Sequence, residues 1–155
     1  VDIFWALQQA ERQIALEAQR SNVLVRLLAP PDLPPALANP NRLHYVFLNL
    51  MLNAIRWTRA LPERKGRVRV SVELVDRDGT PWLRVRFADN GPGIHYNLWE
   101  RVFDMGMTTH KGGSGLGLYI ARSLVEAMGG RLYVAESLRL LGTTFVAELP
   151  AVRVL

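Results

Sequence analysis

Two neighbouring segments of strictly alternating hydrophobicity constrain the fold of this chain more than any other feature. They read G-R-V-R-V-S-V-E-L-V over residues 66–75 and W-L-R-V-R-F-A over residues 82–88. The turn sequence D-R-D-G-T-P separates them, so the pattern predicts an antiparallel β-hairpin. Its inward face is predicted to comprise Val68, Val70, Val72, Leu74, Leu83, Val85 and Phe87. Its other face carries Arg67, Arg69, Arg84 and Arg86, which predicts a sheet with one wetted side.

The buried side of such a sheet needs a covering layer, and three segments have helical periodicity. The first spans residues 3–20, and the second begins with Asn39 or Asn41 as its N-cap and ends near residue 60. The third spans about 115 to 128 and is ended by Gly129-Gly130. The apolar positions are Phe4, Leu7, Ile14 and Leu16 in the first helix, Leu43, Val46, Phe47, Leu50, Met51 and Ala54 in the second, and Leu116, Ile120, Leu124 and Met128 in the third.

Three further strands complete the predicted sheet. They lie at residues 22–29, 131–137 and 143–149, and a turn at Gly142 joins the last two. The fold class is therefore an α/β two-layer sandwich, with helices on one face of a mixed, mostly antiparallel sheet. With 155 residues and no internal repeat, the chain is predicted to be a single domain over 1–155.

The composition excludes several classes of protein. Without cysteine there are no disulfides and no thiolate metal or redox site. No stretch has the roughly 18 to 20 apolar residues that span a bilayer, and the first residues do not resemble a signal peptide. The net charge is +5, but the basic residues are scattered without interleaved aromatics, so we expect no nucleic-acid partner. The chain lacks an initiator Met, and we expect it to be a fragment of something longer.

A polar stripe runs along the long helix. Asn49, Asn53, Arg56 and Trp57 follow helical spacing and fall on the shoulder of the apolar face. A buried amide is costly unless it has partners, and a ligand or metal in a cleft would supply them. The Asn carbonyl is an oxygen ligand suited to Mg²⁺. The alternative is that both asparagines cap neighbouring backbone groups or face water.

A second polar candidate follows the hairpin, in the sequence D-N-G-P-G-I. Asp89, when ionised, can accept a hydrogen bond from the exocyclic amine of an adenine, while Gly91 and Gly93 let the ring approach the backbone. The alternative is a simple Asp-Asn-Gly turn.

A glycine-rich loop precedes the third helix. The sequence G-G-S-G-L-G-L places Gly113, Gly115 and Gly117 at every second position, and such a loop can bind phosphate at a helix N-terminus. The spacing matches neither the Walker A nor the Rossmann pattern, and the motifs of eukaryotic-type protein kinases are missing. The preceding region, 92 to 114, is long for a connection and is predicted to be a functional lid.

Five stretches, taken in order, resemble one family. N-L-M-L-N-A-I-R-W-T is similar to the N box of sensor histidine kinases, D-N-G-P-G-I to the G1 box and E-R-V-F-D to the F box. G-G-S-G-L-G-L is similar to the G2 box, and G-T-T-F to the G3 motif. Over roughly residues 1 to 150 the chain resembles the catalytic ATP-binding domain of a two-component sensor histidine kinase, which has a Bergerat-type (GHKL) fold.

The resemblance implies ATP and Mg²⁺ as cofactors and a role for each matching residue. Asn53 would bind Mg²⁺, Asn49 would support it or contact the phosphates, and Arg56 would face the phosphates. Trp57 would stack near the adenine and Asp89 would hold its amine, with Thr144 (or, less well, Thr143) completing the pocket. Phe103 would anchor the lid, and His110 or Lys111 would reach the phosphates. The full ATP-binding set expected is Asn49, Asn53, Arg56, Trp57, Asp89, Gly91, Gly93, Ile94, His110, Lys111, Gly113, Gly115, Leu116, Gly117, Leu118 and Thr144.

The same resemblance implies a donor of phosphoryl groups. Related ATPases have a Glu general base four residues before the Mg²⁺-binding Asn, but position 49 here is Asn, which favours a kinase over a hydrolase. None of the three histidines has the context of a phosphoacceptor, so the acceptor would lie on a separate dimerisation domain and pass the group to a response regulator. We expect a monomeric fragment in the cytoplasm, belonging to a full-length protein that can be membrane-anchored. The alternatives are a GHKL-type ATPase and a nucleotide-binding module without transfer activity.

Overall fold

The computed structural model describes residues 1–106 and 116–153. The elements along the chain are α1 (Ile3–Arg20), β1 (Val23–Leu28), α2 (Pro40–Arg59), β2 (Gly66–Arg77), β3 (Thr80–Asp89), the short 3₁₀ helices η1 (Tyr96–Leu98) and η2 (Arg101–Phe103), α3 (Gly117–Ala127), β4 (Arg131–Leu138) and β5 (Gly142–Pro150). None of the helices in these two ranges is long and apolar enough to cross a bilayer.

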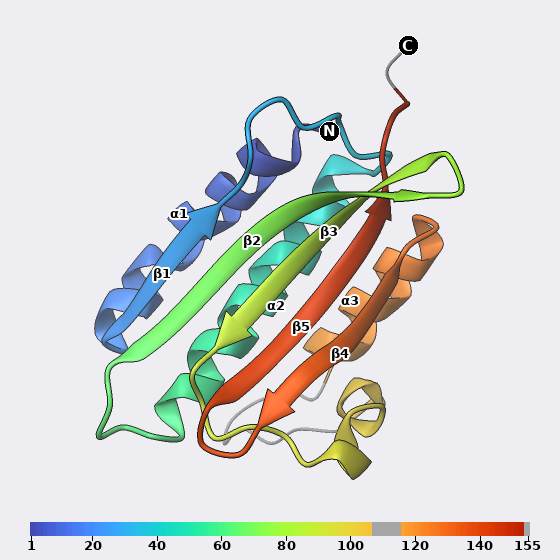
Figure 1. Cartoon of the computed structure of the whole chain (residues 1–155). Helices are drawn as coiled ribbons and strands as arrows, with labels where there is room; N and C mark the ends of the chain where they lie inside the picture. Colours follow the sequence, from blue (N-terminus) through green and yellow to red (C-terminus); the bar gives the residue numbers. More distant parts are fainter. Residues whose placement is uncertain (107–115, 154–155) are drawn as a thin grey trace.

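The strands form one mixed sheet in the order β1-β2-β3-β5-β4. β1 pairs in parallel with β2, and all other neighbours are antiparallel. Figure 1 looks onto the open face of this sheet and shows α1, α2 and α3 together behind it. The predicted two-layer α/β sandwich is therefore confirmed.

The central helix α2 contributes a continuous buried face to the core. Its N-cap is Asn39, whose side chain accepts hydrogen bonds from the N–H groups of Asn41 and Arg42 at 3.0 and 3.1 Å. Its predicted apolar face is buried throughout, and Phe47 packs against Phe87 of β3 with ring centroids 5.9 Å apart. The apolar face of the hairpin, whose residues alternate, thus packs against the apolar face of α2, whose residues follow helical spacing.

The faces of the outer helices differ from the prediction. In α1, Phe4 and Leu16 are exposed, and the buried face also includes small residues such as Ala6 and Ala10. In α3, the fully buried positions are Ala121 and Val125, whereas the predicted stripe, one residue earlier, is exposed or only half-buried. In α1 the predicted Leu7 and Ile14 are buried together with these alanines. Small side chains let both helices approach their neighbours closely, which is why alanines share the buried faces.

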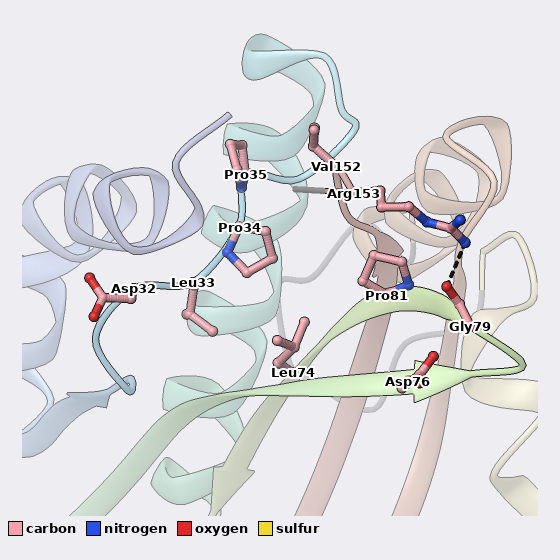
Figure 2. A pocket seen from close by; sticks show the side chains of 10 residues that line it. All are labelled: Asp32, Leu33, Pro34, Pro35, Leu74, Asp76, Gly79, Pro81, Val152 and Arg153. Atoms are coloured by element: carbon pink, nitrogen blue, oxygen red, sulfur yellow. Dashed lines mark hydrogen bonds between the residues drawn. The ribbon is translucent and has the colours of Figure 1, made fainter. Parts of the chain in front are cut away.

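The hairpin is longer than its alternating core. β2 and β3 continue to a two-residue turn at Asp78 and Gly79, both with positive φ (51° and 82°), as expected of a type I′ turn. Leu74 lies on the predicted inward face, paired with the buried Leu83, but it is 51% exposed because it borders an open cavity at this end of the sheet. Figure 2 shows that cavity, with Leu33, Pro34 and Pro35 of the α2-preceding loop on one side and Pro81 and Val152 on the other.

Helix α3 ends as its sequence predicts. Gly129 has a φ of +83°, and the N–H groups of Gly129 and Gly130 donate to the carbonyls of Glu126 and Val125 at 3.0 and 2.9 Å. This is the Schellman motif, which turns the chain directly into β4.

Candidate functional site

The candidate site lies at the end of β3, where Asp89 leaves the sheet on the side covered by α2. Asp89 is 7% exposed, and two residues of the polar stripe, Asn53 and Trp57, are buried on α2. The first residues of β5 follow Gly142, whose α-carbon is packed against the backbone of Asp89. The sequence motifs of α2, β3 and β5 therefore converge at one end of the sheet.

The carboxylate of Asp89 is held from one side only. Its Oδ1 accepts hydrogen bonds from the N–H groups of Gly91 at 2.9 Å and Thr143 at 3.3 Å. Its Oδ2 is buried, and no group in residues 1–106 or 116–153 donates to it. A buried oxygen without a donor is costly, so a ligand that brings an N–H or O–H group would be stabilised here.

Burial also alters the protonation of Asp89. Loss of water raises the pKa of its carboxyl from 3.8 to about 6, although the two backbone N–H groups act in the opposite direction. At neutral pH the group is still mostly ionised, so Oδ2 acts as an acceptor and not as a donor. Such a combination of burial and raised pKa is typical of a functional carboxylate.

The adjacent threonine is Thr143 and not Thr144. Phe87 pairs with Phe145, and Thr144 pairs with Ala88, so the side chain of Thr144 lies on the open face of the sheet. Thr143 lies on the same face as Asp89, is 2% exposed, and its hydroxyl contacts that of Ser137 at 2.8 Å. The register therefore favours Thr143, because a shift of one residue in a strand reverses the face.

The glycines of the D-N-G-P-G-I turn are required by the protein's own backbone. A Cβ on Gly91 would lie 2.7 Å from the carbonyl oxygen of Trp57. Gly93 has a φ of +90°, and a Cβ there would lie 2.6 Å from the carbonyl oxygen of Leu138. Both glycines therefore allow the turn to pack against α2 and β4, which fixes the wall of the site beside Asp89.

Gly142 is a site residue whose importance the sequence analysis missed. It was predicted only as a turn residue, yet its φ is +125° and a Cβ would collide with the carbonyl oxygen of Asp89. This close approach brings the Thr143 N–H to the Asp89 carboxylate. The G-T-T-F motif could have indicated this role of Gly142, because the glycine immediately precedes Thr143.

The polar stripe on α2 divides into two environments. Asn53 and Trp57 are buried, whereas Arg56 is exposed. The Asn49 amide donates to the Tyr45 carbonyl at 2.9 Å, and its Oδ1 lies 2.8 Å from the position that a Cβ on Gly117 would occupy. Asn49 thus packs against the first residue of α3, at the C-terminal end of the glycine-rich loop.

Aromatic packing fixes the position of the short helix η2. Phe103, predicted to be an anchor, is 3% exposed and meets Phe145 edge-on at 5.8 Å, and the Arg122 guanidinium lies 4.7 Å above its ring. Arg122 also pairs with Glu100 at 2.8 Å. These contacts tie η2 to α3 and β5.

The remaining predicted residues have mixed placements. Ile94 is buried, and its N–H donates to the Ser137 hydroxyl at 2.6 Å. Leu118 packs partly against the core, and Leu116 is 40% exposed. His110, Lys111, Gly113 and Gly115 lie outside the described residues.

A metal at this site would not depend on a cluster of protein ligands. Residues 1–106 and 116–153 contain no group of three or more His, Asp or Glu side chains that could hold an ion. Mg²⁺ commonly takes one or two protein oxygens and completes its shell with phosphates and water. The buried amide of Asn53 fits such a limited contribution.

Comparisons with known proteins show the family to which the chain belongs. Residues 38–153 match the family described as histidine kinase-, DNA gyrase B-, and HSP90-like ATPases. The sensor histidine kinase AruS of Pseudomonas aeruginosa is 42% identical over 114 residues, which are 69% of this chain and 11% of AruS. The chain spans 11% to 30% of the first curated relatives that it matches.

Solved structures share the whole fold. Full-length ShkA in complex with AMPPNP superposes with a TM-score of 0.82 and 30% identity, covering 99% of this chain and 31% of ShkA. The histidine kinase ThkA in complex with the response regulator protein TrrA gives a TM-score of 0.78 and 25% identity, covering 98% of this chain and 41% of ThkA.

Proposed function

Because the chain belongs to the family of histidine kinase-, DNA gyrase B-, and HSP90-like ATPases, and has the ATP-binding domain of sensor histidine kinases, we propose that it binds Mg-ATP and donates the γ-phosphoryl group to a histidine on a separate dimerisation domain. The observation that carries the proposal is the buried Asp89 carboxylate, with one oxygen held by backbone N–H groups and the other without a donor among the described residues. An adenine amine is the donor that this second oxygen suits.

Around Asp89, each neighbouring residue has a proposed task. Thr143 and Trp57 complete the adenine pocket, because both are buried on the side of the sheet that Asp89 faces. Asn53 would hold Mg²⁺, which when bound neutralises charge on the phosphates. Arg56 is exposed near the end of α2 and can reach toward an anionic ligand. His110, Lys111 and the glycines of the loop are proposed phosphate contacts on the strength of the motif alone.

The reaction proposed is transfer to histidine and not hydrolysis. Hydrolysis by a general base needs a group that accepts a proton from water near the γ-phosphate. Asn49, at the position where related ATPases have Glu, is an amide whose Nδ2 is engaged by the Tyr45 carbonyl. The chain's contribution would therefore be positioning and charge stabilisation, which are the main terms in phosphoryl transfer.

The partners proposed are the histidine-bearing domain and a response regulator receiver domain. The match to ThkA, crystallised with the response regulator protein TrrA, supports the second of these. A cytoplasmic location is proposed as well, because ATP, the proposed donor, is a cytoplasmic metabolite.

Two measurements test the proposal. Calorimetric titration with ATP, with and without Mg²⁺, should show binding that Mg²⁺ strengthens, and absence of any binding would refute the nucleotide site. The domain, incubated with labelled ATP and the dimerisation domain of a sensor histidine kinase, should label the acceptor histidine. An acceptor His→Gln variant is the control, and steady ATP hydrolysis without labelled histidine would indicate an ATPase instead.

A further inference from the structure

The open face of the sheet carries seven arginines in two different situations. Four of them are ion-paired: Arg77, Arg84 and Arg131 surround the buried carboxylate of Glu148, and Arg86 pairs with Glu73. The other three are Arg26, Arg67 and Arg69, which we call the arginine triad. Within residues 1–106 and 116–153, the triad makes no ion pair.

The triad is assembled by strand register. Arg67 and Arg69 are two residues apart on β2, so they share a face, and their neighbours Val68 and Val70 are buried on the other side. The parallel pairing of β1 with β2 sets Arg26 directly beside Arg69. Like charges at paired positions of a sheet repel and destabilise the pair, so an anion bound there would relieve the repulsion.

A small cavity lies among these side chains. Its volume is about 230 Å³, and its lining comprises Leu24, Arg26, Arg67, Val68 and Arg69. Guanidinium groups above an apolar floor suit a carboxylate carried on a short aliphatic stem, because the stem contacts Leu24 while the charge meets arginine. The cavity is too small for a nucleotide but accommodates one acidic side chain.

From these contacts we infer that the arginine triad is a docking site for an extended acidic segment of a partner protein. Arg67 and Arg69 are about 7 Å apart along β2, the same spacing as alternate side chains of an extended peptide. Glutamates at every second position would therefore meet both arginines, and Arg26 would add a second contact to one of them. β1 is an edge strand, so an approaching segment meets no further strand on that side.

Nucleic acid fits the same surface less well. Single-stranded nucleic acid is bound through arginines combined with aromatic side chains on which bases stack. The aromatic rings of the open face, Trp82 and Tyr133, already have the guanidinium groups of Arg77 and Arg131 over them, each at 5.1 Å. The lining of the cavity at the triad includes Leu24 and Val68 but no aromatic side chain.

The test uses the 155-residue chain and two fluorescent eight-residue peptides, one with glutamate and one with glutamine at alternate positions. Anisotropy should show binding of the glutamate peptide only, weakening as salt rises. The double variant R26E/R69E should bind at least about tenfold more weakly, while R12E/R42E, with the same change of net charge on exposed helical arginines, should keep affinity within about twofold.

Three results would overturn the inference. They are equal losses in the two double variants, binding of the glutamine peptide at similar affinity, and tighter binding of an eight-nucleotide single strand than of the glutamate peptide. Circular dichroism and ATP affinity provide the folding control, since the triad lies on the face opposite Asp89.

Discussion

In the unliganded protein, the ionised form of the buried Asp89 carboxylate lowers the stability of the folded state. Its carboxyl pKa is raised from 3.8 to about 6, so the folded state favours the protonated form more than the unfolded state does. The stabilisation of the folded state that comes from this favoured protonation is complete below pH 3.8 and is lost as the pH rises through 6. At pH 7 the ionised group therefore destabilises the fold, by on the order of 2 to 3 kcal/mol.

This leads to opposite expectations for stability and binding in D89N. The neutral amide removes the cost of a buried charge, so the variant should have a higher free energy of unfolding at pH 7, by about 1 to 3 kcal/mol. The difference should shrink toward pH 4, as measured by urea denaturation. ATP affinity should fall at least about tenfold, because an amide N–H would face the adenine amine. Unchanged affinity would remove Asp89 from the site.

Gly142 allows a second prediction at the residue scale. G142A should lower the free energy of unfolding by at least about 2 kcal/mol, because the new Cβ meets the Asp89 carbonyl and the φ of +125° is unfavourable for alanine. G106A is the matched control, since Gly106 has a φ of +82° with nothing within 4 Å of its Cβ position. It should cost about 1 kcal/mol, and equal losses in urea denaturation would show that the contact with Asp89 is unimportant.

At the scale of elements, the open face of the sheet is organised by one buried carboxylate. Glu148 on β5 is 1% exposed and receives hydrogen bonds from Arg77, Arg84 and Arg131 at 2.7 to 2.9 Å. Burial pushes its pKa upward, but the three guanidinium groups outweigh this and lower the pKa to about 2. Its stabilisation is therefore present above pH 4.5 and is lost as the pH falls through 2.

E148Q should lower the free energy of unfolding at pH 7 by roughly 2 to 4 kcal/mol, because three guanidinium groups lose their shared carboxylate. The deficit should diminish below pH 4.5, where the wild-type carboxyl begins to lose its advantage. Urea denaturation across pH 2 to 7 measures this. E73Q, which removes the exposed carboxylate that pairs with Arg86, is the control and should cost less than about 1 kcal/mol. Equal costs would show that Glu148 acts as an ordinary surface residue.

Helices and strands were predictable from the sequence where the spacing of the apolar residues matches the face that is buried. The hairpin, α2 and its Asn39 cap followed from alternation, from helical spacing and from capping chemistry. The buried face of α1 was predicted in part, since Leu7 and Ile14 are buried but Phe4 and Leu16 are exposed. That of α3 was not, because Ala121 is fully buried against its neighbours and the predicted stripe is not. The choice between Thr143 and Thr144 failed for a related reason: only the pairing of Thr144 with Ala88 defines which residue faces the site.

On the scale of the whole molecule, nucleotide binding should raise the thermal stability of the domain. At an ATP concentration of 100 Kd, linkage adds about 2.7 kcal/mol, which corresponds to a rise in Tm of roughly 5 to 10 °C for a domain of this size. GTP should give almost no rise, because it presents a carbonyl oxygen where adenine has its amine, and D89N should show a clearly smaller rise with ATP than the wild-type chain. Scanning calorimetry measures these shifts. An equal response to ATP and GTP would show that the bound base does not contact Asp89.

Both described ends of the chain lie together, at the pole of the molecule remote from Asp89 (Figure 1). The Val1 backbone nitrogen donates to the Ala36 carbonyl at 2.9 Å, Ala36 bridges to Ala151, and the Ala151 N–H donates to the Pro81 carbonyl at the far end of β3 from Asp89. Eight residues of strand correspond to about 26 Å. Asp89, the proposed nucleotide contact, therefore lies about one strand length from the end of the sheet where Val1, Ala36 and Ala151 meet. A rotation about that end would displace Asp89 more than any residue that lies nearer to it.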